Sequence, residues 1–212
     1  MKRLAQYFLV FGSLMALLSC EKFLDVDPEF TQDAENYFLN PQDYELALIG
    51  AYDLLQTSYL TQWVGEIASD HAIAGGESVT DTQGLHEIEN MNHNAVNNEL
   101  RSLFQFTYTG IARCNYIMEN RDNIDFEGKN RVIGETRFLR AYYYFELVKY
   151  FGGVPLIIDE RIGADEVTEI DRASKAAVYD QIEADLTYAV DNLDWGRFEK
   201  GRADKGAALA LL

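Results

Sequence analysis

The sequence predicts an all-α protein in which antiparallel helix pairs are joined by long irregular loops. Apolar residues recur at spacings of three and four through most of the chain, which is the period of a helix. Asn, Ser and Asp residues precede several of these stretches, where they favour the start of a helix. The two longest stretches are separated by only a short turn, and helices joined in that way pack antiparallel.

The first predicted helix begins at Asn40 and Pro41. Asn is a favoured N-cap, Pro is favoured at the first helical position, and acidic residues suit the positive first turn. Its apolar stripe consists of Tyr44, Leu48, Ala51, Tyr52 and Leu55. A shorter apolar helix is predicted around residues 60–69. Residues 72–98 are polar and rich in Gly and Asn, so we expect irregular structure there with room for a helical turn.

The helical period returns from about Val96 to Arg121, and after a turn at residues 123–128 a second long helix is predicted from about Lys129 to Phe151. This second helix carries an unusual aromatic load, formed by Tyr142, Tyr143, Tyr144, Phe145, Tyr150 and Phe151. Because it has almost no wholly polar face, we expect it to pack on both sides inside a helical stack, with the tyrosines at 142–144 as core or interface residues. Gly152 or Gly153 can end the helix, and Pro155 prevents it from resuming.

Residues 154–158 are predicted to be extended, and a polar linker then leads to Ser174 as the N-cap of another helix. The stripe of that helix consists of Val178, Ile182, Leu186, Ala189, Val190 and Leu193. A turn at residues 191–205 precedes a last helix that Asp204 can cap. The chain stops at Leu212 inside an apolar helical pattern without a closing residue, so we expect it to be the N-terminal part of a larger α-rich protein.

The N-terminus predicts secretion and lipid attachment. Lys2 and Arg3 precede an apolar stretch at residues 4–18, which is shorter than the roughly 20 residues that span a bilayer as a helix. We therefore interpret residues 1–19 as a signal peptide. Cys20 follows a small residue at the cleavage point, as in bacterial lipoproteins, so we expect its thiol to be lipidated; a plain signal peptide with a chance cysteine is the alternative. Residues 20–31 would form an extended leader between the lipid and the folded body.

The charge of the chain excludes one class of partner. The formal net charge is −17, and removal of residues 1–19 would take away two positive charges and no acidic residue, which leaves −19. A protein this acidic is repelled by phosphate backbones, so we expect no nucleic-acid partner. With Cys20 lipidated, Cys114 has no partner for an intrachain disulfide, and we expect it to be a buried, inert thiol.

Five segments together resemble one family. The most specific is residues 135–156, in which an acidic residue is followed by Arg-Phe-Leu-Arg-Ala, an aromatic run and Phe-Gly-Gly-Val-Pro-Leu. The others are residues 20–28, 111–115, 179–186 and 201–208, of which Asp204 stands where the family more often has a small hydroxyl residue. In order and spacing they are similar to SusD/RagB-like proteins, the surface lipoproteins that capture nutrients for TonB-dependent outer-membrane transporters.

The resemblance implies more than the helical pattern does. It implies that the helix pairs of residues 32–212 form the incomplete N-terminal helical domain of a SusD-like protein, stacked in a tetratricopeptide-like manner. No clean 34-residue repeat is visible, so the residues alone support only helix pairs. The resemblance also implies a lipid-anchored location at the outer membrane, exposed on the cell surface, and a SusC-like TonB-dependent transporter as partner.

No pattern of residues predicts catalysis, so we expect neither an enzyme nor a cofactor. The segment from His86 to Asn90 resembles a zinc-protease helix only until Asn90, which stands where the second His is required. His86, Glu89 or Asn90, and His93 can share a helical face, which leaves a metal site as an alternative to ordinary solvent-exposed histidines. Nucleophile elbows, phosphate loops and paired-cysteine metal motifs are absent from the sequence.

Binding of a glycan is the favoured alternative to catalysis. Sugars bind where aromatic rings meet their apolar faces and where amides and carboxylates bond their hydroxyls. Residues 62–98 have this mixture, and the resemblance implies that the region contributes to a ligand face. The candidate binding residues are Trp63, Asp70, His71, Glu77, His86, Asn92 and His93. A core tryptophan is the alternative for Trp63, and a helix-end cap is the alternative for Asp70 and His71.

Three hypotheses about function therefore follow from the sequence. The first is a lipid-anchored surface protein that binds an oligosaccharide, or else a peptide, and passes it to the transporter without making or breaking a bond. The second is a tetratricopeptide-type scaffold that binds only proteins. The third is a hydrolase, for which the sequence offers no defined pair of carboxylates.

Overall fold

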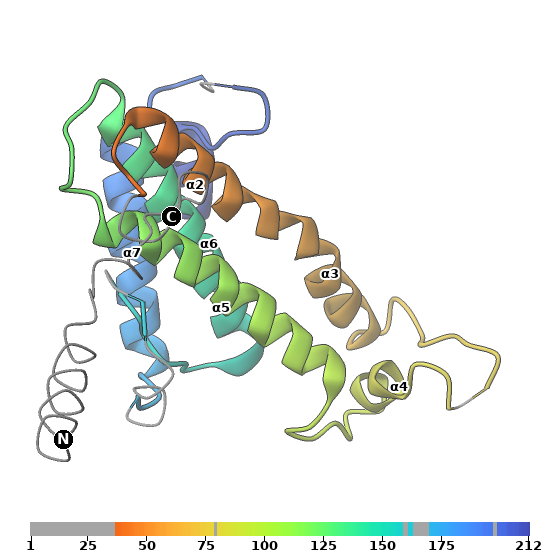
Figure 1. Ribbon diagram of the computed structural model, residues 1–212. Coiled ribbons are helices and arrows are strands. Elements are labelled where there is room, and N and C mark those ends of the chain that lie inside the picture. Colours follow the sequence, from red (N-terminus) through yellow and green to blue (C-terminus); the bar gives the residue numbers. More distant parts are fainter. Residues whose placement is uncertain (1–36, 79, 159–160, 163–169, 197–198) are drawn as a thin grey trace, which may run out of the picture. The chain divides into compact units, whose positions relative to one another are not determined.

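The helix order follows the sequence-based expectation closely (Figure 1). The computed structural model describes residues 37–78, 80–158, 161–162, 170–196 and 199–212, and the residues from 38 onward form one compact unit. The predicted signal peptide, Cys20 and the leader lie outside the described residues. All regular elements of the described residues are helices, so the prediction of an all-α protein is confirmed. Within the same residues, no helix combines the length and the apolar content that a membrane crossing needs.

Helix α2 (Pro41–Asp53) begins with a capping box. The Asn40 side chain accepts a bond of 3.2 Å from the Asp43 N–H, and the Asp43 carboxylate accepts one of 3.1 Å from the Asn40 N–H. A 3₁₀ turn, η2 (Leu54–Thr57), then leads directly into α3 (Ser58–Ile67). Because the 3₁₀ turn changes the residues per turn, Leu54 is buried and the predicted Leu55 is only half-buried. Tyr52 of the predicted stripe is likewise half-buried, whereas Tyr44, Leu48 and Ala51 are buried.

One short helix, α4 (Gln83–Glu89), lies in the otherwise irregular stretch between α3 and α5. It is the helical turn for which the sequence left room. Helix α5 (Asn98–Glu119) begins two residues later than predicted because the Asn97 side-chain oxygen caps the N–H groups of Glu99 and Leu100. The Asn97 side-chain nitrogen also donates bonds of 2.9 Å to the Gly84 carbonyl and to the Glu87 carboxylate. One buried amide therefore ties the loop helix α4 to the start of α5.

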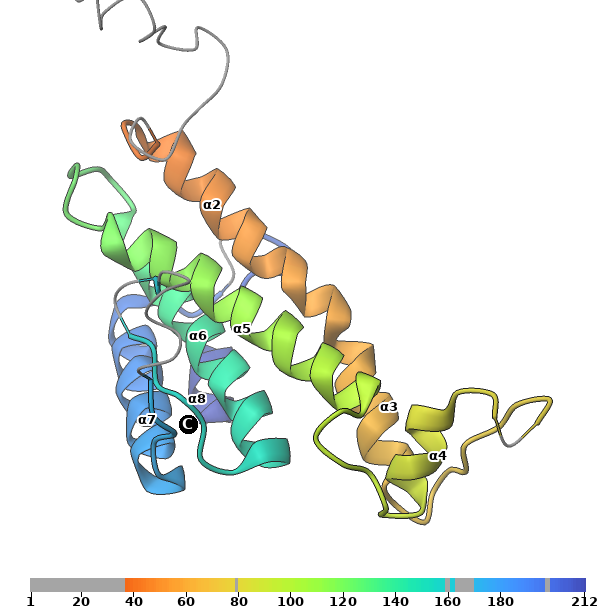
Figure 2. The same cartoon turned by 60° about the horizontal axis from the view of Figure 1, so that its bottom comes forward.

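Helices α5 and α6 (Lys129–Phe151) form the predicted antiparallel pair, and α6 contacts α2, α5 and α7 (Figure 2). The aromatic run is in the packed interior: Tyr143 and Tyr144 are buried, and Tyr142 is half-buried. The Tyr143 hydroxyl donates a 2.7 Å bond to the Ala51 carbonyl of α2. Gly110 of α5 leaves room for the Tyr143 ring, because a Cβ there would lie 2.5 Å from a ring carbon. Packing of α6 on both sides is confirmed.

The last two helices also begin where the sequence predicted. Helix α7 (Lys175–Asn192) is capped by the Ser174 side chain, which accepts from the Ala177 N–H at 3.1 Å. Helix α8 (Lys205–Leu211) is capped by Asp204, whose carboxylate accepts from the Ala207 N–H at 2.8 Å. The predicted stripe of α7 is buried except for Val190, which is half-buried.

A buried ion pair joins the three central helices. Arg140 of α6 is 1% exposed, and its guanidinium donates two bonds, of 2.8 and 2.9 Å, to the carboxylate of Asp185 on α7. A third bond of 3.0 Å reaches the side-chain oxygen of Asn115 on α5. The Asn115 side-chain nitrogen donates in turn to the Ile157 carbonyl at 2.9 Å, and the Tyr144 hydroxyl donates to the same carbonyl at 2.9 Å. This Arg140 network is bidentate and fully buried, so its geometry defines how α5, α6 and α7 meet.

A second polar cluster joins α2 to α6 and to the turn before α8. The Glu135 carboxylate, which is fully buried, accepts bonds from the Tyr52 hydroxyl at 2.7 Å and from Arg131 at 2.6 Å. Arg202 lies 3.4 Å from the same carboxylate and 3.1 Å from that of Glu45, which also pairs with Arg131. Burial and the neighbouring Glu135 carboxylate raise the pKa of Tyr52 far above its usual range, so the hydroxyl remains a donor. The cluster therefore fixes α2 against the end of the stack.

Removal of one partner of the Arg140 network should destabilise the fold strongly. We expect Arg140→Met to lower the free energy of unfolding by about 3–5 kcal/mol, because Asp185 would be left buried and charged without a partner. The double variant Arg140→Met/Asp185→Leu should recover part of this loss, because it removes both charges. Urea denaturation of the three proteins measures the difference, with the exposed Lys200→Gln as control. A single variant as stable as the wild type would show that the network does not hold the helices.

Candidate functional site

A pocket of about 740 Å³ lies where the C-terminal end of α6 meets α3 and the start of α5. We call it the helix-end pocket. Its size is in the range of small-molecule sites in proteins, which is about 300–1,000 Å³. The residues that line it are Val64, Ala68, Ile88, His93, Asn94, Ala95, Leu100, Arg101, Phe104, Lys149, Tyr150, Phe151 and Arg172.

Two glycines after α6 allow a later segment of the chain, which carries Arg172, to lie against the end of that helix. Gly152 ends the helix with a φ of +68°, a value that L side chains rarely adopt. Gly153 then passes so close to the segment before α7 that a Cβ on it would lie 2.2 Å from the Ala173 carbonyl oxygen. The Ala173 N–H donates a 3.1 Å bond to the Val154 carbonyl at this crossing. Arg172 is thereby held next to the last turn of α6, although 20 residues separate them.

Aromatic rings form one wall of the helix-end pocket. Phe104 of α5 and Phe151 of α6 meet edge to face, with ring centroids 5.3 Å apart. The Tyr150 hydroxyl donates a 2.5 Å bond to the Thr61 carbonyl of α3, so that ring is held across the two helices. All three rings are half-buried. They offer flat apolar surface to a ligand without being free to collapse into the core.

Polar side chains line the rest of the helix-end pocket. His93 and Asn94 come from the connection between α4 and α5, and both are exposed. The Asn94 side-chain oxygen accepts the Val96 N–H at 2.9 Å, which orients the amide and leaves its nitrogen as a donor. Arg101, Lys149 and Arg172 add further donors. Rings beside donors of this kind are the mixture that a carbohydrate site requires.

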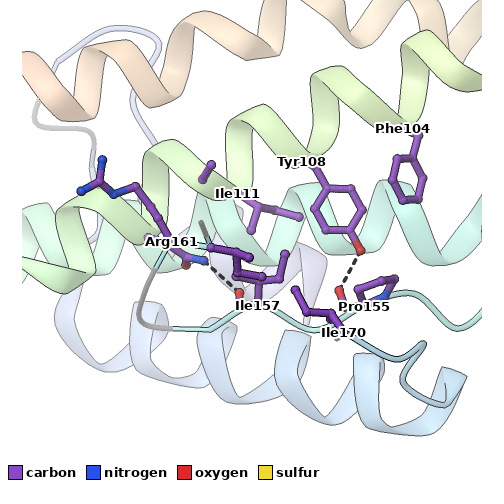
Figure 3. A pocket seen from close by; sticks show the side chains of 10 residues that line it. Phe104, Tyr108, Ile111, Pro155, Ile157, Arg161 and Ile170 are labelled. Carbon is purple, nitrogen blue, oxygen red and sulfur yellow. Dashed lines mark hydrogen bonds between the residues drawn. The ribbon is translucent and has the colours of Figure 1, made fainter. Parts of the chain in front are cut away.

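A second pocket, of about 340 Å³, lies beside the helix-end pocket and shares Phe104 with it (Figure 3). Its walls are almost entirely apolar, and Figure 3 shows Ile111, Ile157 and Ile170 turned toward one another. The Tyr108 hydroxyl in this wall already donates to the Pro155 carbonyl at 2.7 Å. Asn115 is likewise bonded to the Ile157 carbonyl, and Arg161 is paired with the Glu119 carboxylate. Because its few polar groups already have partners, this apolar pocket is poorly suited to the many hydroxyls of a sugar.

The loop between α3 and α5 forms a third, polar pocket of about 490 Å³. It is lined by Thr80, Gln83, His86, Glu87, Asn90 and Asn92. The His86 ring nitrogen Nδ1 lies 3.5 Å from the Glu89 carboxylate, and its Nε2 is buried without a hydrogen-bond partner among the described residues. His86 and Asn92, two of the candidate binding residues, thus line the same pocket. Across the described chain, no three His, Cys, Asp or Glu side chains gather into an arrangement that holds a metal ion.

The other predicted binding residues are dispersed. His93 lines the helix-end pocket, but Asp70, His71 and Glu77 are exposed loop residues outside the three pockets. The end of α3 is closed by Ser69, whose hydroxyl donates to the Glu66 carbonyl at 2.7 Å and accepts the His71 N–H at 3.2 Å. Trp63 is 53% exposed and stands edge-on to Tyr59, so the core alternative for this residue was wrong.

The sequence analysis missed most of the helix-end pocket. Arg101, Lys149 and Arg172 lie on three different elements, and Tyr150 and Phe151 share the helical period of the core residues. Periodicity assigns such rings to the interior, and nothing in the spacing shows that they stand at its edge. The packing of α5 against α6 and the crossing at Gly153 together bring the three elements to one place. The sequence carried a partial signal, because a Gly-Gly pair can mark a close backbone approach.

Cys114 is a buried free thiol. Burial raises the pKa of this thiol to about 12, so it remains protonated at neutral pH and is a poor nucleophile. The prediction that Cys114 is a buried thiol is confirmed.

Comparison with known proteins assigns the chain to a family. The family described as "Starch-binding associating with outer membrane", a SusD-like family, matches residues 22–212. The chain belongs to the SusD-like family. The curated SusD-like protein P38 of Formosa agariphila is 31% identical over 196 residues, which are 91% of this chain and 38% of that protein.

Solved structures agree with this assignment. A laminarin-binding SusD-like protein superposes with a TM-score of 0.74 at 32% identity, over 81% of this chain and 39% of that one. Surface glycan-binding protein A from Bacteroides uniformis superposes with a TM-score of 0.71 at 27% identity, over 81% and 40% of the two chains. The chain spans between 36% and 40% of the length of the curated relatives it matches.

Substitution of Gly153 should disturb the pocket and the fold together. We expect Gly153→Ala to lower the free energy of unfolding by about 1–3 kcal/mol, because the added methyl group would collide with the Ala173 carbonyl. Gly75→Ala is the matched control, since nothing lies within 4 Å of a Cβ there. Urea denaturation of both variants measures the difference. Equal midpoints for the two would contradict the proposed crossing.

Proposed function

We propose that this chain belongs to a lipid-anchored outer-membrane protein that binds an oligosaccharide at the helix-end pocket. The ligand passes without chemical change to a SusC-like TonB-dependent transporter. The observation that carries the proposal is the pocket itself, where the rings of Phe104, Tyr150 and Phe151 stand beside side chains with free donors. The apolar faces of sugar rings stack on such rings, and their hydroxyls accept from such donors.

Family membership supports two parts of the proposal, glycan binding and attachment to the outer membrane. The family description names starch binding and association with the outer membrane, and two similar structures are named for laminarin or glycan binding. Cys20 at the end of an apolar leader supplies the lipid anchor, and the acid-rich body fits attachment by lipid better than attachment by a basic patch. The candidates Trp63, Asp70, His71, Glu77, His86 and Asn92 stay as contacts for parts of the ligand beyond the pocket.

Two other functions remain to be tested. A scaffold that binds only proteins would use the stacked helix faces and leave the helix-end pocket empty. Capture of a peptide would use the same pocket with different partners, because Asn94 and His93 can also bond a peptide backbone. Glycan capture, peptide capture and a protein-binding scaffold differ in the class of ligand they bind, so a test of glycan binding is the decisive measurement.

Loss of one ring should weaken glycan binding without unfolding the protein. We expect Phe151→Leu to reduce the affinity for an oligosaccharide that the wild type binds by about threefold to tenfold, because leucine fills similar space without a flat face. The oligosaccharide is chosen with a glycan array and the affinity is measured by calorimetry. Phe145→Leu is the control, since Phe145 is a half-buried ring of α6 that does not line the helix-end pocket. Equal losses in the two variants, or no glycan binding by the wild type, would contradict the proposal.

Removal of the lipid site should release the protein from the membrane. We expect Cys20→Ala protein to appear in the soluble fraction of detergent-free extracts, whereas the wild type sediments with outer membranes. Cys114→Ala is the matched control, because that thiol is buried in the helical stack and should not affect anchoring. Co-sedimentation of the Cys20→Ala protein with outer membranes would rule out lipid attachment as the anchor.

A further inference from the structure

We propose that the helix-end pocket selects acidic oligosaccharides, in which a sugar carries a carboxylate or a sulfate group that Arg101 and Arg172 bind. This inference rests on the proposed glycan-binding function and adds the charge class of the ligand. Three observations carry it. The charge of the pocket lining is opposite in sign to that of the chain, these two arginines have no carboxylate partner among the described residues, and both line the same pocket as the aromatic rings.

The sign of charge in the helix-end pocket is opposite to that of the protein. The chain has 35 acidic and 18 basic residues, so an average patch of its surface is negative. The described residues that line the pocket include Arg101, Lys149 and Arg172 but no aspartate or glutamate. A positive pocket in a strongly negative protein concentrates anions at that place and repels them elsewhere.

The two arginines of the pocket differ from the other arginines that the structure describes. Seven of the nine described arginines lie within 4.0 Å of a carboxylate: Arg113, Arg121, Arg131, Arg137, Arg140, Arg161 and Arg202. Arg101 and Arg172 have no such partner among the described residues. In a chain with almost twice as many acids as bases, two unpaired guanidinium groups in one pocket are the exception.

Lys149 contributes less to the positive charge. Its ammonium group donates a 2.7 Å bond to the Glu146 carboxylate one turn earlier on α6, and that carboxylate is almost fully buried. Among the described residues, this pair leaves Arg101 and Arg172 as the lining cations that have no carboxylate partner. A guanidinium binds carboxylate and sulfate oxygens through two parallel hydrogen bonds, a geometry that a sugar hydroxyl does not match.

The surroundings of the arginines indicate a sugar acid and not an isolated anion. Phe104 and Phe151 stand in the same pocket, and the crossing at Gly153 holds Arg172 beside them. A sugar that carries an acidic group presents a flat apolar face to the rings and a negative edge to the guanidinium groups. A neutral sugar would meet the rings, and its hydroxyls would accept hydrogen bonds from the guanidinium groups, but it would bring no charge to pair with them.

Paired ligands test the charge without changing the sugar chain. We would titrate the purified lipoprotein in non-ionic detergent with oligogalacturonate and with its neutral methyl ester, and in parallel with a sulfated carrageenan oligosaccharide and its desulfated form. We expect the acidic member of at least one pair to bind about tenfold more tightly at low salt than its neutral form. That advantage should shrink in 0.3 M NaCl, because the Debye length falls below about 8 Å and the attraction between exposed charges weakens. The ligand pair whose acidic member binds more tightly shows whether the recognised group is a carboxylate or a sulfate.

Variants test the two arginines. We expect Arg101→Gln and Arg172→Gln each to weaken binding of the acidic oligosaccharide about threefold to fivefold, with little change for its neutral form. Lys200→Gln, which removes an exposed charge outside the helix-end pocket, is the matched control and should leave both affinities unchanged.

The outcomes separate this inference from the function on which it rests. Equal binding of acidic and neutral forms, with Phe151→Leu still weakening both, would overturn the charge selectivity and leave the glycan site intact. Binding of an oligoglutamate peptide in place of any sugar would overturn both proposals in favour of peptide capture. If no oligosaccharide and no peptide binds, the proposed function is overturned and this inference with it.

Discussion

The buried guanidinium of Arg140 is the constraint on which the rest of the helical stack depends. A charge in the interior is tolerated only when it is paired and its hydrogen bonds are satisfied, and Asp185 and Asn115 meet this demand from two other helices. Apolar contacts between α5, α6 and α7 have no preferred direction. The bidentate pair does, because each hydrogen bond needs its own distance and direction, so it adds to what apolar packing defines.

The same network continues toward the pocket. Asn115 and Tyr144 both bind the Ile157 carbonyl, so the chain that leaves α6 is held against the core within a few residues of the helix end. At Gly153 this chain crosses the segment before α7, and the crossing brings Arg172 to the last turn of α6. The helix-end pocket is therefore a consequence of how the central helices are joined. We expect its shape to depend more on the stack than on the loop at residues 72–97.

Much of the fold was predictable because its signals are local. Asn40, Ser174 and Asp204 begin helices as expected, since a capping side chain acts on backbone groups only two or three residues away. The segments that carried the family resemblance prove to be structural: Asn115, Arg140 and Asp185 come from three of them and meet in one network. The candidate site was less predictable. His93 was found, but Trp63, although exposed, does not line the helix-end pocket, and Arg101, Lys149 and Arg172 have no local feature that separates them from other basic residues.

The sequence by itself determined the family, the all-α class, the order of the helices and the aromatic core of α6. These follow from periodicity, capping and an ordered set of motifs, all of which are properties of residues near one another in the chain. Only the tertiary structure decided which of the described arginines pair with a described carboxylate and which do not, and which rings stand at the edge of a pocket. Those properties depend on distances between residues far apart in the chain, such as Arg101 and Arg172, which are 71 positions apart, and Glu45 and Arg202, which are 157 positions apart, and no local rule encodes them. The long-range crossing at Gly153 and the buried pair at Arg140 set those distances.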